Sequence, residues 1–260
     1  MPDNNDIYAV FLDIDGTLIY NSHIMSGRVK NTLERVKAAG HKVFLNSGRS
    51  LRYLPKELKA QFCWDGFVAG CGSSVYINGK TVFDRHMDKE LLKKVCDFYF
   101  SEKTGCLLEG EDILLSINEP PHPDKVPLRS PKELETLYVN RRINKITMDG
   151  VLSDRGKKLL LDYFDCIQFD NYAELVLKGV SKAEGMKTAM RYIRADKSLA
   201  IGDSLNDMAM LEAADVSVAM GNAPDYIKNV CDFTTDSVFD DGAAVFLENY
   251  LLRNCKNESL

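Results

Sequence analysis

Short apolar segments alternate with amphipathic ones over the first 80 residues, and this alternation limits the possible folds more than any other feature. The apolar segments at 8–12, 41–45 and 66–70 ("YAVFL", "HKVFL" and "GFVAG") have the length of buried strands. Between the first two, apolar residues recur at helical spacing over 26–40, and a second helical stretch is expected near 55–60. Strand and helix in alternation predict an α/β fold, with a parallel sheet covered by helices on both faces.

The pattern changes near residue 84 and resumes near residue 179. The intervening residues contain amphipathic helices, one of them at 153–164, and a predicted hairpin of two strands around Glu109-Gly110. A helical pattern and an apolar strand then restore the doubly wound order. We therefore predict a Rossmann-like core made of residues 1–83 and 179–260, with an inserted α+β domain at 84–178.

The composition of the chain limits the kinds of molecule that the protein is expected to bind. The chain carries 33 basic and 38 acidic residues, a net charge of −5, without a long run of like charges, whereas nucleic-acid binding normally requires a basic stripe. The sequence shows neither a secretory signal nor an apolar run of transmembrane length. We therefore expect a cytoplasmic protein without membrane or nucleic-acid partners, monomeric or weakly self-associating. Seven scattered cysteines without paired spacing predict neither a disulfide framework nor a zinc site.

Polar residues follow three of the predicted strands. They are Asp13 and Asp15 after the first, Asn46 and Ser47 after the second, and Asp203, Asn206 and Asp207 after a strand at 198–201. Because ligands bind at the carboxyl ends of parallel strands, these side chains are expected to converge. Several carboxylates in one crevice repel one another unless a divalent cation lies among them, and hard oxygen ligands suit Mg²⁺. Lys182, at the start of a predicted helix, would balance the charge of a phosphate, so the set fits phosphoryl transfer through an aspartyl-phosphate.

These motifs occur in an order that resembles a known family. The motifs are "DIDGT" at 13–17, "NSGR" at 46–49, "SK" at 181–182 and "GDSLNDMAML" at 202–211, with the insert between the second and the third. Over essentially its whole length the chain resembles a haloacid-dehalogenase-superfamily (HAD) phosphatase of the Cof-type subclass IIB. The resemblance implies an HAD-like core with an α/β cap that selects the substrate. It also implies magnesium-dependent hydrolysis of a small phosphorylated metabolite, with a sugar phosphate as the first candidate.

The resemblance assigns roles to individual residues. Asp13 would be the nucleophile, and Asp15 would be the acid that protonates the leaving group and then the base that activates water. The residues that bind the substrate phosphate would be Ser47, Gly48, Lys182 and Asn206. The magnesium ligands would be Asp13, the backbone carbonyl of Asp15, Asp203 and Asp207, the last either directly or through water.

Several of these residues also have a purely structural interpretation. Asp15 and Gly16 form a common turn pair, and Ser47 could cap a loop. The segment at 181–184 ("SKAE") is a capping box by itself, and the segment at 204–207 ("SLND") fits a helix N-terminus with an acid in its first turn.

Other points stay open in the sequence. Cys71 lies where relatives often have an asparagine, and it could line the pocket or be an inert buried thiol. Arg49 is a candidate contact for the leaving group. The alternatives to a phosphatase are a phosphomutase of the same superfamily, a non-enzymatic module that switches on phosphorylation of an aspartate, and a magnesium-binding scaffold without turnover.

Overall fold

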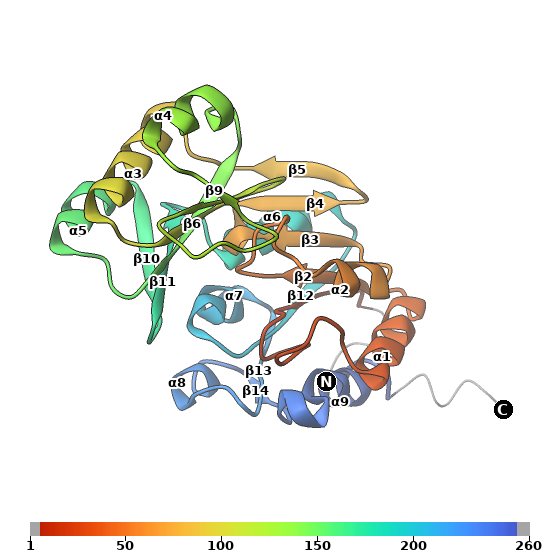
Figure 1. Cartoon of the computed structure of the whole chain (residues 1–260). Coiled ribbons are helices and arrows are strands. Elements are labelled where there is room, and N and C mark those ends of the chain that lie inside the picture. The colour runs from red at the N-terminus through yellow and green to blue at the C-terminus, as the bar shows by residue number, and fades with distance from the viewer. Residues whose placement is uncertain (1–5, 254–260) are drawn as a thin grey trace.

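The computed structural model describes residues 6–253, which form two β-sheets and their covering helices (Figure 1). The larger sheet has eight strands in the order β14-β13-β12-β1-β2-β3-β4-β5. Its strands are β1 (Tyr8–Leu12), β2 (Lys42–Asn46), β3 (Gly66–Ala69), β4 (Ser74–Ile77), β5 (Lys80–Asp84), β12 (Lys197–Gly202), β13 (Val216–Ala219) and β14 (Phe233–Thr234). The strands from β14 to β3 run parallel, and β4 and β5 add an antiparallel hairpin at one edge.

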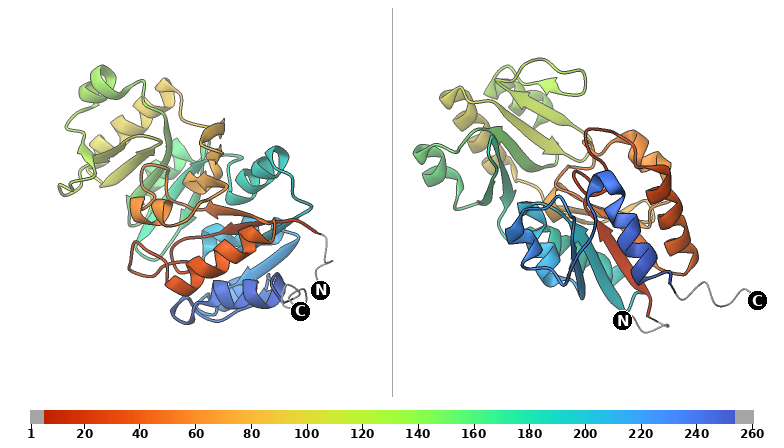
Figure 2. Two further views of the ribbon diagram at one scale, coloured as in Figure 1. Left: turned by 90° about the vertical axis from the view of Figure 1, so that its right-hand side faces the viewer. Right: turned by 90° about the horizontal axis from the view of Figure 1, so that it is seen from below.

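Helices cover both faces of this sheet. They are α1 (Gly27–Ala38) and α9 (Gly242–Tyr250) on one face, which Figure 2 shows together, and α6 (Lys182–Tyr192), α7 (Met208–Ala213) and α8 (Asp225–Lys228) on the other. The short helix α2 (Lys56–Gln61) packs with the first group through Leu58. Side chains of β1 alternate accordingly, because Val10 and Leu12 belong to one hydrophobic core and Phe11 to the other. The predicted doubly wound α/β core is therefore confirmed.

Local sequence signals explain why α1 forms where it was predicted. The Ser26 side chain accepts a hydrogen bond from the backbone N–H of Val29, which caps the first turn. Val29, Leu33 and Val36 are all buried on the face that meets the sheet. Gly40 follows the helix with a positive φ of 96°, a conformation that suits glycine.

The smaller sheet has six strands in the order β10-β11-β9-β6-β7-β8. Its strands are β6 (Cys106–Gly110), β7 (Leu114–Ile117), β8 (Val126–Pro127), β9 (Ile143–Asp149), β10 (Phe164–Gln168) and β11 (Tyr172–Leu177). Its helices are α3 (Lys89–Glu102), α4 (Pro131–Glu133), which continues as a π-helical turn at Leu134–Tyr138, and α5 (Asp154–Leu160). One face of the sheet packs with α3 and α5 around a single hydrophobic core that includes Leu108, Ile146 and Leu175. All six strands lie within the predicted insert, whereas its division from the core as a substrate-selecting domain stays a prediction.

Two local predictions are wrong, and one hairpin was missed. The turn of the β6–β7 hairpin lies at 111–113, and Glu109 and Gly110 both belong to β6. The helix predicted at 153–164 ends at Leu160, and the chain then enters β10, which pairs with β11. The β4–β5 hairpin was not predicted, although its turn is Asn78-Gly79, both with positive φ, which is a strong hairpin signal.

The part of the chain that the structure describes contains no helix that is both long and apolar enough to cross a membrane. The cysteines described there are free, with Cys71, Cys96 and Cys106 buried and Cys63 and Cys166 exposed. Cys255, the seventh cysteine of the sequence, lies outside the described residues.

Candidate active site

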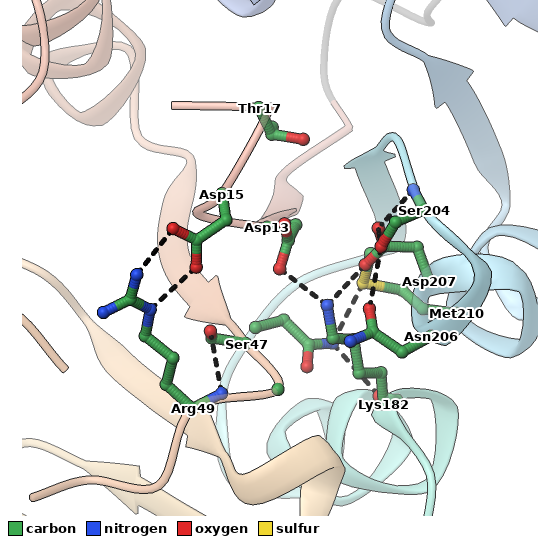
Figure 3. A network of polar contacts seen from close by, with 12 residues as sticks. Asp13, Asp15, Thr17, Ser47, Arg49, Lys182, Ser204, Asn206, Asp207 and Met210 are labelled. Carbon is green, nitrogen blue, oxygen red and sulfur yellow. Dashed lines mark hydrogen bonds and ion pairs between the residues drawn. The ribbon is translucent and has the colours of Figure 1, made fainter. Parts of the chain in front are cut away.

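The predicted site residues meet at the carboxyl edge of three neighbouring parallel strands (Figure 3). Asp13 follows β1, Ser47 follows β2 and Asp203 follows β12. The register pairs β1 with both of the other strands, so the three strand ends lie side by side. These residues are far apart in the sequence but lie close together, because the strands are parallel and all end at the same edge of the sheet.

Lys182 lies between two carboxylates at the centre of the site. Its Nζ is 2.6 Å from Oδ1 of Asp13 and 2.5 Å from Oδ1 of Asp207 (Figure 3), and all three side chains are buried. Burial lowers the pKa of a lysine, but the charges of Asp13 and Asp207 outweigh burial and raise it here. Ser181 caps α6 by accepting from the backbone N–H of Glu184. The capping interpretation of this motif is therefore correct for Ser181, and the same turn directs Lys182 into the site.

Asp207 uses both of its carboxylate oxygens within the protein. Oδ1 accepts from Lys182, and Oδ2 accepts from the backbone N–H groups of Asp203 and Ser204 at 3.1 and 3.0 Å. Ser204 and Asp207 also form a capping box at the short helix Leu205–Asp207, as the sequence allowed. This arrangement holds the loop that carries Asp203. It favours the prediction that Asp207 binds a metal through water over direct binding.

Asp203 packs against the turn that follows β1. Gly16 has a φ of +86°, and a Cβ atom there would lie 2.2 Å from Oδ2 of Asp203, so this approach requires glycine. Thr17 donates to Oδ1 of Asp203 at 3.2 Å, and Asn222 donates to the carbonyl oxygen of Gly16 at 2.9 Å. Thr17 and Asn222 were not predicted as site residues. Thr17 lies inside the first motif, which is the signal that could have identified it.

The carboxylates of Asp13, Asp203 and Asp207 form a compact group, in which one oxygen of each lies within 4.8 Å of the others. Burial first, and then the charge of Asp207, raise the pKa of Asp13 well above its ordinary value and that of Asp203 to about 7. These shifts mean that Lys182 alone does not compensate the three negative charges. A divalent cation would do so, and a set of carboxylate oxygens is the donor chemistry that Mg²⁺ prefers. The residues therefore fit the predicted magnesium ion.

Asp15 points away from this acidic group. Its carboxylate accepts from Nε and from one terminal nitrogen of Arg49, each at 2.7 Å (Figure 3), and the side chain is 54% exposed. The turn interpretation of the Asp15-Gly16 pair is also correct, because the backbone N–H groups of residues 17–19 all donate to the carbonyl oxygen of Ile14. The turn places the two carboxylates of the first motif on different sides of the site, so that Asp13 is buried and Asp15 is accessible.

Ser47, Gly48 and Asn206 surround the remaining side of the site. The Ser47 hydroxyl accepts from the backbone N–H of Arg49 at 3.2 Å, which leaves its own hydrogen for another acceptor. A Cβ atom on Gly48 would lie 2.9 Å from Nδ2 of Asn206, so the loop and Asn206 are in close contact. The structure thus brings these three residues and Lys182, the four predicted phosphate-binding residues, to one place.

Cys71 is a buried thiol beside this loop. Its backbone N–H donates to the carbonyl oxygen of Ser47, and its φ of 56° is uncommon for a residue other than glycine, asparagine or aspartate. Burial raises the pKa of the thiol, so the reactive thiolate is disfavoured. The two interpretations left open by the sequence are compatible, because the unreactive thiol also belongs to the lining of the cavity that contains Lys182 and Asn206.

The smaller sheet contributes three charged residues that the sequence analysis did not identify. They are Glu109 on β6, Lys145 on β9 and Glu174 on β11, all buried against the loops of the larger sheet. Each is the single charged residue of a mostly uncharged strand segment ("LLEG", "INKITM" and "YAELVL"). That pattern alone is typical of a strand with one face in water, so it gave no sign of burial.

Two cavities adjoin the site. One of about 580 Å³ lies between β10 and α7, and Lys182 and Asn206 are part of its lining. The other, of about 450 Å³, lies beside Arg49 and is bounded by residues of both sheets' domains, among them Arg52 and His122. The site is therefore reached from two sides, and Arg49 connects the second cavity to Asp15.

Comparison with known proteins agrees with this geometry. The family model of haloacid dehalogenase-like hydrolases matches residues 10–247. The chain belongs to the haloacid dehalogenase-like hydrolase family, as its motifs predict, and the prediction that it is an enzyme is confirmed.

Relatives cover nearly the whole chain. The putative phosphatase YkrA of Bacillus subtilis (strain 168) is 26% identical over 247 residues, which cover 92% of this chain and 96% of the relative. The structure of BT1666, an HAD phosphatase from Bacteroides thetaiotaomicron, matches with a TM-score of 0.81 at 23% identity, covering 96% of this chain and 97% of that one. The subclass IIB sugar phosphatase BT4131 matches with a TM-score of 0.79 at 22% identity, covering 94% and 98%. These likenesses confirm the predicted HAD fold.

Proposed function

We propose that the protein is a magnesium-dependent phosphatase that hydrolyses a small phosphorylated metabolite through an aspartyl-phosphate on Asp13. The observation that carries the proposal is the placement of Lys182 between Asp13 and Asp207, with the accessible Asp15 two residues from Asp13. A nucleophile, a cation for the phosphate and a separate acid are the groups that this chemistry requires.

The first step would transfer the phosphoryl group to the enzyme. Oδ of Asp13 forms a bond to phosphorus, the bond from phosphorus to the substrate oxygen breaks, and Asp15 gives its proton to the departing alcohol. Lys182 and the free hydrogen of the Ser47 hydroxyl would hold the phosphoryl oxygens, because both point into the site. In the second step Asp15 takes a proton from water, the water oxygen bonds to phosphorus, and inorganic phosphate leaves Asp13.

Magnesium would be held by Asp13, Asp203 and the backbone carbonyl of Asp15, with Asp207 supporting the loop. When bound, the ion would supply positive charge that balances the carboxylates and the phosphate. The pKa values of Asp13 and Asp203, both raised by burial and by Asp207, support this role, since a cation at the site favours their ionised forms.

Residues 84–178 would act as a cap that selects the leaving group. Asp15 marks the side on which the leaving oxygen departs, and the cavity of about 450 Å³ beside its partner Arg49 is bounded by both domains. The polar side chains there, including Arg52 and His122, suit a leaving group rich in hydroxyl groups. Since a solved protein of this fold is described as a sugar phosphatase, sugar phosphates are the first substrates to test.

The test is phosphate release from a panel of sugar phosphates, phosphorylated acids and nucleotides, with Mg²⁺ or with EDTA. We expect magnesium-dependent release from at least one sugar phosphate, and a loss of ~10⁴-fold or more in Asp13→Asn, because the nucleophile is removed. The matched control is Asp154→Asn, at a 92% exposed carboxylate on α5, which should retain activity.

Other outcomes would change the proposal in defined ways. Release only from nucleotides or phosphorylated acids would replace the substrate class and keep the chemistry. Conversion of one sugar phosphate into its isomer without release of phosphate would identify a phosphomutase. Full activity of Asp13→Asn would overturn the assigned nucleophile.

A further inference from the structure

Three charged residues of the smaller sheet lie on the face that is turned toward the core. Glu109 pairs directly with Lys145 across β6 and β9, and Glu174 pairs with Thr147 across β11 and β9, so all three lie on one face. The polar face of an antiparallel sheet is commonly in water. Here it is covered, and the exposed fractions of Glu109, Lys145 and Glu174 are only 1%, 2% and 6%. We call these three residues the Lys145 cluster.

The ammonium group of Lys145 contacts three oxygen atoms. Its Nζ lies 2.5 Å from Oε1 of Glu174, 2.8 Å from the carbonyl oxygen of Gly48 and 3.5 Å from Oε1 of Glu109. Two of these contacts, with Glu174 and Gly48, are hydrogen bonds, and the longer one with Glu109 is an ion pair. One of the three contacted residues, Gly48, belongs to the predicted phosphate-binding loop of the core.

The cluster fixes this loop at two places. The carbonyl of Gly48 and the N–H of Arg49 belong to one planar peptide unit, so Lys145 also orients the N–H that donates to the Ser47 hydroxyl. Two residues later, the backbone N–H of Ser50 donates to Oε2 of Glu109 at 3.2 Å. The orientation of the Ser47 hydroxyl thus depends, through one peptide unit, on a lysine of the other sheet.

Glu174 makes the equivalent contact with the loop that follows β12. Its Oε2 accepts from Nδ2 of Asn206 at 3.3 Å and from the thiol of Cys71 at 3.4 Å. Glu174 therefore contacts both Asn206 and the residue that hydrogen-bonds the Ser47 carbonyl. The cluster touches the loops of Ser47 and Asn206 but makes no hydrogen bond to the nucleophile Asp13 among the described residues.

Buried charges stabilise a permanent contact between two domains less well than apolar residues do. Apolar residues of similar volume are often more stabilising, because the loss of hydration offsets much of the attraction between buried ions. A charged face, however, regains its hydration when it separates from the core, whereas an apolar face would not. The chemistry of this surface therefore suits a contact that forms and opens repeatedly.

We propose that the Lys145 cluster positions the phosphate-binding groups of the core when the two domains are in contact, so that Ser47 and Asn206 are fully ordered only in the closed protein. The inference rests on the proposed function, and it adds positioning residues that bind neither the metal nor the reacting atoms. A phosphate group bound at Ser47 would in turn favour the closed arrangement, because the same loop contacts both.

The experiment compares Lys145→Met and Glu174→Gln with the whole wild-type chain. Binding of inorganic phosphate in the presence of Mg²⁺ is measured by calorimetry, and hydrogen exchange is followed in the segment 47–50. We expect Lys145→Met to weaken phosphate binding about tenfold, since the hydrogen bond from the ammonium group to the carbonyl oxygen of Gly48 is removed, and to lose protection at the Arg49 amide, which belongs to the same peptide unit. The milder Glu174→Gln, which keeps the shape, should weaken phosphate binding by a smaller factor.

The matched control is Ile146→Val, on the same strand but on the opposite, apolar face. It destabilises the smaller domain without touching the core, so phosphate binding should be unchanged. If Lys145→Met and Ile146→Val bind phosphate as the wild type does, or if both lose affinity in proportion to stability, the positioning role is overturned. Where Lys145→Met does not fold, Glu174→Gln decides the question by the same measurement.

The results distinguish a failure of the positioning role from a failure of the proposed phosphatase function. If the wild type binds phosphate but hydrolyses no substrate of the panel, the proposed function fails and the positioning role is still judged by the binding data. If substrates are hydrolysed with KM and kcat unchanged in both cluster variants, the proposed function stands and the positioning role fails. A wild-type protein that binds no phosphate would overturn both.

Discussion

Beside each of the two β-sheets, one lysine is buried between two carboxylates. In the core, Nζ of Lys182 is 2.6 Å from Asp13 and 2.5 Å from Asp207. In the smaller domain, Nζ of Lys145 is 2.5 Å from Glu174 and 3.5 Å from Glu109. The two clusters have the same formal charge, and in both cases the carboxylates outweigh burial and raise the pKa of the lysine.

The clusters differ in what remains unsatisfied. In the Lys145 cluster the lysine also donates to the carbonyl oxygen of Gly48, and both carboxylates accept further hydrogen bonds. In the core, by contrast, Asp13 accepts a hydrogen bond only through Oδ1, as far as the described residues are concerned. Asp203 lies beside it as an additional negative charge. A carboxylate with an unused acceptor oxygen next to a cavity is available for reaction or binding. A carboxylate whose two oxygens both accept hydrogen bonds can only hold its neighbours in place.

After the loss of the nucleophile Asp13, the largest effect is expected at Asp15, because both proposed proton transfers take place in the core. Asp15→Asn should lower kcat for a sugar phosphate by about 10²–10⁴-fold, because the leaving alcohol needs a proton. With p-nitrophenyl phosphate, whose leaving group needs no acid, it should release one equivalent of nitrophenol rapidly and then turn over slowly. Rapid-quench kinetics measures both phases.

The control for this prediction is in the other cluster. Glu109→Gln should leave the ratio of activities on the two substrates at its wild-type value, because Glu109 does not reach the leaving group. Equal losses on both substrates in Asp15→Asn, with no initial phase, would contradict the role of Asp15 as an acid.

The two buried lysines should differ in their effect on activity, although not in their effect on stability. Lys182→Met and Lys145→Met should each lose about 3–5 kcal/mol of unfolding free energy, because two buried carboxylates are left without their cation. Only Lys182→Met should also lower kcat by about 10²–10³-fold, as expected for a group that stabilises charge on the transferring phosphoryl. Urea unfolding and steady-state kinetics of the two variants test this pair, and equal kcat values would remove the distinction between the clusters.

Magnesium binding should depend on pH in the core. Burial, followed by the charge of Asp207, raises the pKa of Asp203 to about 7 in the metal-free protein. Protons therefore compete with the cation at lower pH, and the Kd for Mg²⁺ should fall as the pH rises through about 7, by up to about tenfold per unit. Calorimetry at several pH values measures the slope. Asp203→Asn should bind Mg²⁺ more weakly and with a flatter dependence, and a wild-type Kd that is independent of pH would contradict the assignment.

The smallest effect concerns stability in acid. Burial raises the pKa of Glu174, but the charge and hydrogen bond of Lys145 outweigh it, so the pKa lies below the ordinary value of 4.5. A carboxyl with a depressed pKa contributes stability that is present above about pH 4.5 and is lost as the pH falls through its value in the folded protein. The unfolding free energy of Glu174→Gln should therefore decline less steeply than that of the wild type below about pH 4.5. Parallel declines in urea titrations would show that Glu174 is not coupled to folding.

The core and most of its site could be predicted from local sequence. Apolar segments followed at once by Asp13, Ser47 and Asp203 place those residues at strand ends, and a parallel sheet brings strand ends together. The β4–β5 hairpin was missed in spite of a local signal at Asn78-Gly79, whereas β10 carries little signal of its own. β10 is a strand because β11 offers it a partner, and such pairing is a tertiary effect that overrides weak propensity.

The doubly wound core, the family and the polar residues at the carboxyl edge of its sheet therefore follow from the sequence alone, because each depends on patterns within a few residues of the chain. The burial of Glu109, Lys145 and Glu174, by contrast, depends on the tertiary structure. A charged residue in a strand has the same local pattern whether its face meets water or another domain. Which of the two it meets depends on the packing of segments that are far apart in the chain, and here that packing places the cluster against Gly48, Ser50 and Asn206.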